Sequence, residues 1–378
     1  MPEACHLCGA AGLKEFAAFP TLARVTSDCR PFRPGGRLAS CPTCGALQKV
    51  ADAALAADCK EIYAGYRLYH QGEGQEQRIF DQHSGSSRPR SALILDHLER
   101  FLSREAPAAG RLLDIGCGEG FFLAAFGRRF PGWRLSGLDM GGRYRATVLG
   151  LPGVEDYFDG DPALAAGPYD LVTLNHTLEH IPGPATYLER VQGLLRPGGL
   201  LLVNVPDWTA NPFDLAVADH CTHFTEPVLA RALARAGLAP LSLDRTAIPK
   251  EWLAVARAGD PASGPDPAPA DRAAAQAALD WLGRFAAGAR DAAAGRRLGI
   301  FGTAIAGVWL DAALAGRAEF FVDEDPGRAG SAFMGRPVHL PCQVPAGAAV
   351  VLAFPPAVAR GIAGRLAGLP FDLMIPED

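Results

Sequence analysis

Short apolar runs alternate with stretches of helical periodicity between residues 88 and 257. Apolar residues at the spacing of one helical face predict a helix over 91–101. The other elements expected, in chain order, are a strand at 111–115, a helix at 121–130, strands at 133–138 and 169–174, a helix at 185–195, a strand at 200–205, a helix at 227–236, and edge strands at 241–243 and 251–256. This alternation predicts an α/β, doubly wound, Rossmann-like sheet with right-handed crossovers.

A second alternating zone follows a Pro-rich stretch. The prolines in 258–270 lack a backbone donor and resist regular structure, so this stretch is expected to be a linker. Beyond it we expect helices at 271–294, 305–314 and 357–366 and strands at 298–301, 320–322 and 350–354. Residues 271–378 are therefore predicted to form a smaller, C-terminal Rossmann-like unit.

The first strand of the middle zone runs directly into a glycine-rich turn, within Leu-Leu-Asp-Ile-Gly-Cys-Gly-Glu-Gly at 112–120. Glycines let the backbone turn sharply and approach a ligand closely. Asp139 ends the next strand about 20 residues later, where a carboxylate can bind a ribose diol. Position 121 is phenylalanine, where a dinucleotide-binding turn carries glycine. With Asp114 in the strand, the pattern favours binding of S-adenosylmethionine (SAM) over binding of NAD. The alternative is a tight turn that binds no ligand.

This run resembles motif I of the class I SAM-dependent methyltransferases. Tyr-Asp-Leu-Val-Thr-Leu-Asn-His-Thr-Leu-Glu-His at 169–180 resembles the fourth strand of that family and the turn after it. Arg-Pro-Gly-Gly-Leu-Leu-Leu-Val at 196–203 resembles the family's turn into the fifth strand. The resemblance covers the whole middle zone, taken as 86–257, and implies a SAM-dependent methyltransferase domain.

The resemblance also implies how a cofactor site is divided among residues. Asp139 is expected to bind the ribose hydroxyls, with Met140 beside the adenine. Asn175 is expected to offer its backbone to the amino end of the cofactor. The residues expected along the methionine and ribose are Gly116, Gly118 and Gly120, with Asp114 nearby.

Four of the nine cysteines form two Cys-x-x-Cys pairs near the N-terminus, each followed by glycine. They are Cys5, Cys8, Cys41 and Cys44. Two such loops can present four thiolates to one tetrahedral Zn²⁺, and four thiolates leave no position open for catalysis. A structural zinc site is therefore predicted, with unliganded reduced thiols or a redox pair as the alternatives. His6 and Cys29 are spare ligand candidates that the site does not need.

A polar segment follows the predicted strand at 200–205, at the sheet edge where α/β proteins bind ligands. His220, beside Asp219, is a candidate general base, because imidazole titrates near neutral pH and a carboxylate can orient it. His223 is the competing candidate. The alternative is that the segment only introduces the next helix, for which Thr225 is the expected N-cap.

Two further candidates follow the predicted strand at 169–174. Glu179 and His180 are expected near the position of the transferred methyl group, and each is a candidate for contact with the substrate. The alternative is that both belong to a turn and helix start typical of the family.

Composition restricts the partners. The chain has 378 residues, 49% hydrophobic and 20% charged, which is enough for a large core spread over roughly two to three domains. A net charge of −5 supplies no general attraction to nucleic acid or anionic membrane, and we expect neither as a partner. The opening residues do not form a signal peptide and no apolar run is long enough to cross a bilayer, which predicts a cytoplasmic protein with a small-molecule substrate.

The order of the units resembles a particular group of enzymes. A four-cysteine unit at 1–85, a SAM unit at 86–257 and a Rossmann-like unit at 271–378 are similar to the sugar C-methyltransferases of deoxysugar biosynthesis. Leu-Gly-Ile-Phe-Gly-Thr-Ala-Ile-Ala-Gly at 298–307 and Phe-Val-Asp-Glu-Asp at 321–325 resemble the C-terminal domain of that family. One segment departs from it, because residues 217–220 read Val-Ala-Asp-His where the family carries Tyr-x-Glu-His.

The resemblance implies that the two outer units help to enclose a nucleotide-linked sugar. The expected reaction is C-methylation of a keto deoxysugar, in which His220, oriented by Asp219, removes the proton beside the carbonyl and the enolate takes the methyl group. O- or N-methylation of a sugar, a glycan precursor or another small metabolite is the alternative. The C-terminal unit is expected to hold the nucleotide or its diphosphate at a helix N-terminus, or else to serve as a structural lid.

Two hypotheses from other classes stay open. One is a non-catalytic protein that binds SAM or a sugar. The other is a zinc-dependent interaction module with a methyltransferase that acts on protein or RNA, although the acidic net charge argues against RNA.

Overall fold

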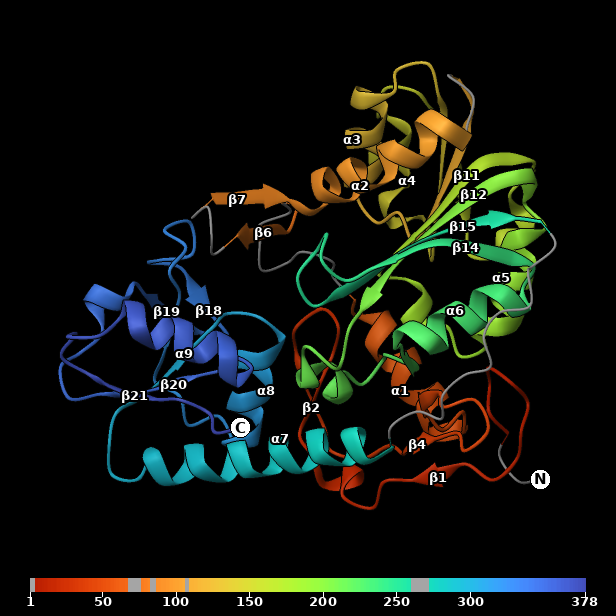
Figure 1. Cartoon of the computed structure of the whole chain (residues 1–378). Coiled ribbons are helices and arrows are strands. Elements are labelled where there is room, and N and C mark those ends of the chain that lie inside the picture. The colour runs from red at the N-terminus through yellow and green to blue at the C-terminus, as the bar shows by residue number, and fades with distance from the viewer. Residues whose placement is uncertain (1–3, 67–75, 82–85, 106–108, 260–271) are drawn as a thin grey trace.

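The computed structural model describes residues 4–66, 76–81, 86–105, 109–259 and 272–378. Figure 1 shows a small N-terminal unit, a central unit around a large sheet, and a C-terminal unit with its own sheet. Within the described ranges, no helix combines the length and the apolar character needed to span a bilayer.

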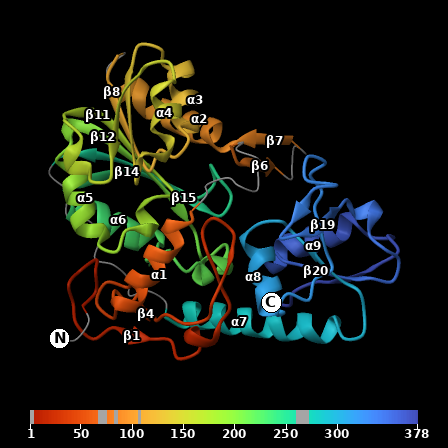
Figure 2. The same cartoon turned by 180° about the vertical axis from the view of Figure 1, so that it is seen from behind.

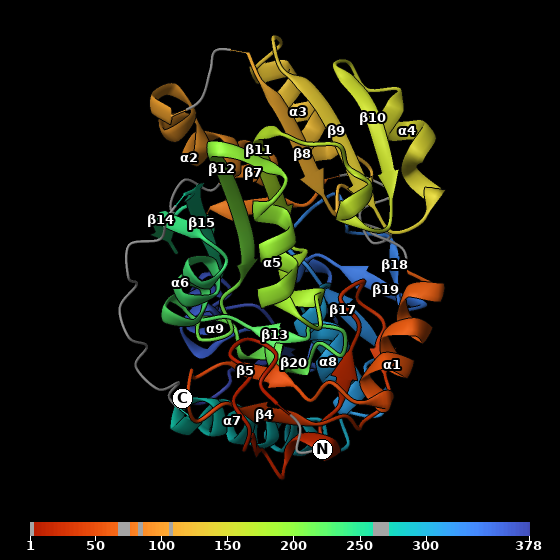
Figure 3. The ribbon, with the colours of Figure 1, turned by 90° about the vertical axis from the view of Figure 1, so that its right-hand side faces the viewer.

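The central unit is built on a seven-stranded sheet of order β10-β9-β8-β11-β12-β15-β14. Its strands are β8 (Arg111–Ile115), β9 (Arg134–Asp139), β10 (Val154–Asp159), β11 (Tyr169–Asn175), β12 (Leu195–Pro206), β14 (Leu238–Asp244) and β15 (Glu251–Ala258). β15 runs antiparallel to β12 and β14, and the remaining neighbours are parallel. Figure 3 looks across this sheet, with β10 at one side and β14 at the other. The predicted doubly wound α/β sheet is confirmed.

The prediction of two edge strands at the end of this unit is wrong for one of them. β15 lies inside the sheet, where both of its edges are paired, and nearly all of its residues are buried. Of these two strands, only β14 lies at an edge of the sheet, and its residues are less buried than those of β15. β10 was not predicted, because Val-Glu-Asp-Tyr-Phe-Asp carries three carboxylates and only Tyr157 is buried.

Helices cover both faces of the central sheet. They are α2 (Arg90–Glu105), α3 (Phe121–Arg129), α4 (Arg145–Leu149), α5 (Pro184–Gln192) and α6 (Glu226–Arg235). Along β12, Leu201 and Val203 pack in the core beneath α5 and α6, whereas Leu200 and Leu202 pack in the core beneath α2 and α3. Successive strand residues point to opposite faces, so a strand covered on both sides reads as a continuous apolar run.

The N-terminal unit contains a four-stranded antiparallel sheet of order β1-β4-β5-β13. Its strands are β1 (Lys14–Glu15), β4 (Leu38–Ser40), β5 (Leu47–Lys49) and β13 (Thr222–His223). Other elements before the central sheet are β2 (Arg24–Val25), β3 (Pro31–Phe32), α1 (Ala53–Ala64), β6 (Arg78–Asp81) and β7 (Ser86–Pro89). Because β13 comes from the segment after β12, the predicted histidine segment is hydrogen-bonded into the N-terminal sheet.

The C-terminal unit contains a six-stranded sheet of order β18-β19-β17-β16-β20-β21. Its strands are β16 (Leu298–Phe301), β17 (Phe320–Val322), β18 (Ala332–Phe333), β19 (Arg336–His339), β20 (Ala349–Leu352) and β21 (Asp372–Met374), and its helices are α7 (Arg272–Ala292), α8 (Ile305–Ala313) and α9 (Pro356–Arg365). The predicted Rossmann-like alternation is present. The short strands β18, β19 and β21 escaped the sequence pattern.

Helix α7 joins two cores. Ala275 and Leu279 in its first half pack with Phe16 and Leu38 of the N-terminal unit. Its second half packs with α8 in the C-terminal core, and Figure 2 shows the helix running beneath both units. The predicted linker at 258–270 lies outside the described residues from position 260 on, and Ala258 is the last residue of β15.

Candidate functional site

The glycine-rich turn between β8 and α3 adopts a backbone that favours glycine. Gly116, Gly118 and Gly120 have φ of 77°, 49° and 82°, which lie in the left-handed region. At Gly116 the space is also filled, because a Cβ there would lie 2.1 Å from Thr177 Oγ1. The turn is therefore packed directly against the segment that follows β11.

The residues predicted to hold a cofactor gather at the carboxyl ends of β8, β9 and β11. Asp139 accepts hydrogen bonds from the Gly118 amide at 2.6 Å and from the Met140 amide at 2.7 Å. Burial raises the pKa of Asp139. Met140 itself is 74% exposed, so its side chain is open to a flat ligand.

Asp114 is buried beneath this turn. Its Oδ1 accepts hydrogen bonds from Thr173 Oγ1 at 2.6 Å and Asn175 Nδ2 at 3.2 Å. Burial raises the pKa of Asp114 to about 7. Asn175 Oδ1 is buried and has no hydrogen-bond partner among the described residues, so an acceptor is left unpaired at the end of β11.

The turn after β11 brings Glu179 and His180 to the glycine turn. Thr177 Oγ1 donates to the Ile115 carbonyl oxygen at 3.0 Å, which ties the end of β11 to the end of β8. Leu178–His180 then form a 3₁₀ turn. Both residues predicted near the reacting group therefore lie beside the predicted cofactor site.

His220 is buried against a carboxylate that was not predicted. Its Nδ1 lies 2.7 Å from Oδ1 of Asp214, and His223 Nδ1 lies 2.6 Å from the other oxygen of the same carboxylate. Asp214 belongs to the 3₁₀ turn Pro212–Ala216. Burial alone would lower the pKa of His220, but the charge and the hydrogen bond of Asp214, together with the charges of Glu179 and Asp219, raise it.

The predicted orientation of His220 by Asp219 is wrong. Asp219 turns its carboxylate toward the N-terminal unit, where it accepts hydrogen bonds from the Ser27 amide at 2.9 Å and the Ser27 hydroxyl at 2.5 Å. The Asp219 carboxylate also lies 3.5 Å from His180 Nδ1. Asp219 therefore belongs to the site but supports its His180 side.

His180 faces His220 in an edge-on arrangement, with 4.7 Å between the ring centroids and 85° between the planes. His180 Nδ1 lies 3.0 Å from the Asp219 carbonyl oxygen and 3.1 Å from the Tyr63 hydroxyl of α1. A carbonyl only accepts, so Nδ1 carries the proton. One nitrogen of each ring and one carboxylate oxygen of Glu179 lie within 4.8 Å of one another. Burial, followed by the charge of His220, lowers the pKa of His180.

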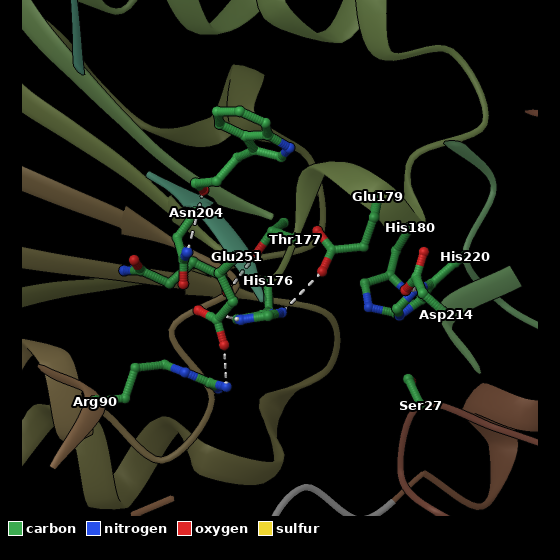
Figure 4. Close-up of polar contacts among 12 residues, drawn as sticks. Ser27, Arg90, His176, Thr177, Glu179, His180, Asn204, Asp214, His220 and Glu251 are labelled. Carbon is green, nitrogen blue, oxygen red and sulfur yellow. Dashed lines mark hydrogen bonds and ion pairs between the residues drawn. The ribbon is translucent and has the colours of Figure 1, made fainter. Parts of the chain in front are cut away.

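Glu179 is the last member of a series of buried ionisable side chains that contact one another. Figure 4 shows Glu251 between Arg90 and His176. Arg90 contacts one oxygen of Glu251 at 2.5 Å, and His176 Nε2 lies 3.2 Å from the other. His176 Nδ1 lies 3.1 Å from Glu179 Oε1. Burial and Arg90 alone would lower the pKa of His176, but the carboxylates of Glu251 and Glu179 raise it to about 9. The cation at His176 therefore fixes one oxygen of Glu179.

His223 is too deeply enclosed to serve as the competing base. Its Nε2 lies 3.1 Å from the ammonium of Lys49, and its Nδ1 is held by Asp214. Burial, followed by the charge of Lys49, lowers the pKa of His223 to about 4. Thr225 is the N-cap of α6, as predicted, although its side chain makes no capping hydrogen bond.

The four predicted cysteine ligands converge. Sγ of Cys5 lies 3.6 Å from Sγ of Cys44, Sγ of Cys8 lies 3.6 Å from Sγ of Cys41, and all four sulfurs lie within 4.8 Å of one another. Four ligands at about 2.3 Å from a tetrahedral zinc ion are about 3.8 Å apart, so this cluster fits zinc.

The two cysteine loops have the same backbone. The Gly9 amide donates to the Cys5 carbonyl at 2.8 Å and the Gly45 amide donates to the Cys41 carbonyl at 2.9 Å. Both glycines have positive φ, of 77° and 78°. His6 and Cys29 do not belong to the sulfur cluster; His6 Nε2 lies 2.9 Å from the Thr222 hydroxyl.

Sequence reasoning missed four residues of the histidine site, namely Ser27, Lys49, Tyr63 and Asp214. The first three come from the N-terminal unit, more than a hundred residues away along the chain, and no local pattern could place them. Asp214 lies only six residues before His220, in a turn that begins at Pro212. This proximity was the sequence signal that could have suggested Asp214 as the partner of His220.

Comparison with known proteins finds similarity within the central unit. Residues 87–243 match a family model described as a methyltransferase domain. The ubiquinone biosynthesis O-methyltransferase of Xanthomonas axonopodis pv. citri (strain 306) is 32% identical over 142 residues, which are 35% of this chain and 58% of that protein. The protein of the same name from Acinetobacter baumannii (strain AYE) is 35% identical over 137 residues, 34% of this chain and 56% of the relative.

The match to these curated relatives thus spans somewhat more than half of their length. Among solved structures, the 1,6-didemethyltoxoflavin-N1-methyltransferase of Burkholderia thailandensis aligns with 57% of this chain and 96% of its own, at 23% identity and a TM-score of 0.38.

Proposed function

We propose that the protein is a SAM-dependent methyltransferase that deprotonates its substrate with His220. The observation that carries this proposal is the position of the buried His220–Asp214 pair. Its ring faces His180, and His180 belongs to the turn that Thr177 ties to the glycine loop. Proton removal and methyl transfer both depend on positioning, so they require a general base fixed by a carboxylate and lying close to the turn that binds the cofactor.

The residues around the glycine turn fit SAM. The left-handed glycines leave the backbone open to close approach, Asp139 supplies a carboxylate for the ribose hydroxyls, and Asn175 Oδ1 is a buried acceptor still to be paired. When bound, SAM supplies an electrophilic methyl group. Gly116, Gly118, Gly120 and Asp114 complete the set that would hold it, with Met140 beside the adenine.

We propose a nucleotide-linked keto deoxysugar as the substrate and carbon as the methylated atom. Because Asp214 holds the proton of neutral His220 on Nδ1, Nε2 carries no proton. Nε2 takes the proton from the carbon beside the carbonyl, and the electron pair of that C–H bond moves into the enolate. Asp214 stabilises the imidazolium that forms, because its carboxylate already contacts Nδ1. The Tyr63 hydroxyl lies 3.1 Å from His180 Nδ1, and we propose that both groups contact the substrate.

O-methylation is the second candidate, because the relatives at 32% and 35% identity are named O-methyltransferases. In that reaction the same nitrogen of His220 would remove a hydroxyl proton. N-methylation differs only in that an amine takes the place of the hydroxyl.

The outer units have supporting roles in this proposal. A structural Zn²⁺ held by the four N-terminal thiolates would stabilise the sheet that carries β13 and would leave no open position for chemistry. We propose that the C-terminal unit holds the nucleotide at the carboxyl ends of β16 and β17. There Thr303 Oγ1 donates to Asp323 at 2.5 Å, and the carboxylate of Asp323 suits ribose hydroxyls.

Exchange in heavy water tests the carbon-directed reaction. Candidate 4-keto sugar nucleotides are incubated with the protein in heavy water, and hydrogen exchange at the carbon beside the carbonyl is followed by NMR. Exchange by the wild type and its loss in His220→Ala are expected, while SAM affinity is kept. His97→Gln, at a histidine of α2 that lies 3.3 Å from Asp244 and outside the histidine site, is the matched control and should behave as wild type. Methylation of a substrate that has no carbonyl would favour the oxygen- or nitrogen-directed reaction.

A further inference from the structure

Lys49, the last residue of β5, is buried against the segment that carries the proposed base. Its ammonium donates to the Leu215 carbonyl oxygen at 3.1 Å and the Val217 carbonyl oxygen at 3.0 Å, and it lies 3.1 Å from His223 Nε2. The His220 carbonyl oxygen lies at the limit of hydrogen bonding, 3.5 Å away. Three close acceptors match the three N–H donors of a charged lysine, which has no acceptor of its own.

These contacts fix the proton positions of both neighbouring histidines. Because the Lys49 ammonium only donates, His223 Nε2 must accept, and the proton of neutral His223 must lie on Nδ1. That proton is donated to one oxygen of Asp214, 2.6 Å away. The other oxygen of Asp214 faces Nδ1 of His220 and holds the proton there. His220 Nε2 is left without a proton, and the His220 ring lies edge-on to the ring of His180.

We propose that Lys49 is a positioning residue for the base, through the sequence Lys49–His223–Asp214–His220. The N-terminal unit thereby determines which nitrogen of His220 can accept a proton. This inference rests on the proposed function for its catalytic consequence, but the proton positions follow from the contacts alone.

The surrounding charges are consistent with this relay. The titratable groups that face His220 are Asp214, Asp219, Glu179, His180 and His223. Those that face Lys49 are Arg24, Cys59, Asp214, Asp219, Cys221 and His223. Burial lowers the pKa of Lys49 to about 8, so the side chain is still mostly cationic at neutral pH. Its charge opposes protonation of His223, which therefore stays a neutral donor to Asp214.

The first test reads the histidine rings directly. Protein with ¹⁵N-labelled histidine is compared with its Lys49→Met variant by NMR, in the absence of any substrate. In the wild type His223 is expected to be neutral with its proton on Nδ1. In the variant the pKa of His223 is expected to rise, because the charge of Lys49 that lowers it is gone, and the pKa of His220 is expected to fall. Unchanged ring signals for both histidines in the variant would overturn the relay.

The second test follows catalysis. Lys49→Met is expected to lower kcat by about tenfold or more, with SAM affinity within about twofold of wild type, and to move the acid limb of the pH profile to lower pH. Lys14→Met removes an exposed charge of the same unit and should change none of these values. A merely structural role would lower activity without moving the acid limb.

Two further variants cover the case in which Lys49→Met does not fold. His223→Asn can still donate to Asp214 and should keep the acid limb of the wild type. His223→Leu can neither accept from Lys49 nor donate to Asp214, so the carboxylate is left to His220 alone and the limb should shift to higher pH. A wild-type limb in His223→Leu would contradict the proposal. If the NMR result is as expected but the wild type methylates no candidate substrate, the proposed function fails and the relay stands.

Discussion

Ser27 holds Asp219 with two hydrogen bonds across 192 residues of sequence, one from its amide at 2.9 Å and one from its hydroxyl at 2.5 Å. Asp219 is thus engaged by the N-terminal unit, and Asp214 is the carboxylate left to contact His220. The two acidic residues lie within one short segment but act on different histidines.

Substitution can separate these two carboxylates. Asp214→Asn keeps the shape but removes the charge that favours the imidazolium of His220, and we expect kcat to fall by about 100-fold or more. Asp219→Asn should cost less than about tenfold, because its main partners are Ser27 and the His180 side of the site. Turnover and SAM affinity are measured for both variants. A larger loss in Asp219→Asn than in Asp214→Asn would return the orienting role to Asp219.

The same contact predicts a pH dependence. Asp214 raises the pKa of His220, so the reaction should accelerate with pH as His220 loses its proton, with a midpoint above the ordinary value of 6.5. In Asp214→Asn the midpoint should move to lower pH, since the burial that remains lowers the pKa. The profile of kcat against pH, taken at saturating SAM, measures the shift, and an unmoved midpoint would argue that another group titrates.

Gly116→Ala should abolish tight SAM binding. The new Cβ would lie 2.1 Å from Thr177 Oγ1, and the backbone φ of 77° is also unfavourable for alanine. Gly368→Ala provides the control, because its φ is 92° and no atom lies within 4 Å of the added carbon. Calorimetric titration should show at least about a tenfold weaker Kd for Gly116→Ala and no change for Gly368→Ala. Equal affinities for Gly116→Ala and wild type would mean that the ligand does not use this turn.

The buried pair of His176 and Glu251 should make stability depend on pH in a defined window. The pKa of His176 is raised to about 9, so its contribution is fully present below pH 6.5 and is lost as the pH rises through about 9. Relative to His176→Gln, the wild type should be more stable by on the order of 2–3 kcal/mol at pH 6, and this advantage should shrink above pH 8. Urea unfolding at several pH values measures it; a gap that widens above pH 8 would refute the assignment.

Removal of the predicted zinc should loosen the N-terminal sheet. Cys41→Ser is expected to release bound zinc, measured by elemental analysis of the purified protein, and to lower Tm by several degrees or more, because metal binding contributes to folding. Cys342→Ser, an exposed cysteine outside the cluster, should retain both metal and Tm. Purified wild-type protein with less than one zinc per two chains, at an unchanged Tm after chelation, would contradict a structural metal.

The fold was largely readable from the sequence because strands buried on both faces leave continuous apolar runs. Arg111–Ile115 and Leu298–Phe301 begin and end at the predicted residues. β10 was missed because its carboxylates hide the pattern, and β13 because a two-residue strand leaves no pattern at all. The place of β15 inside the sheet depends on pairing between distant strands, which local periodicity does not encode.

The site was readable only in part. The glycine turn, Asp139 and the cysteine pairs follow fixed spacings that carry their chemistry, and the structure brings each set together. The partner of His220 was misassigned because the nearest acidic residue in sequence points elsewhere. Lys49 and Tyr63 reach the histidines from another unit, through contacts that only the folded chain creates.

Phe213, next to Asp214, packs its ring against Trp281, Phe285 and Trp309 of the C-terminal core. Replacing the C-terminal unit with that of a relative would therefore also replace the aromatic side chains that pack against Phe213, and Phe213 precedes the carboxylate that contacts His220. A chimaera designed for a new substrate should therefore take α7, α8 and Phe213 from the same parent protein. The natural module boundary is then drawn by this aromatic cluster, and not by the Pro-rich stretch that divides the sequence.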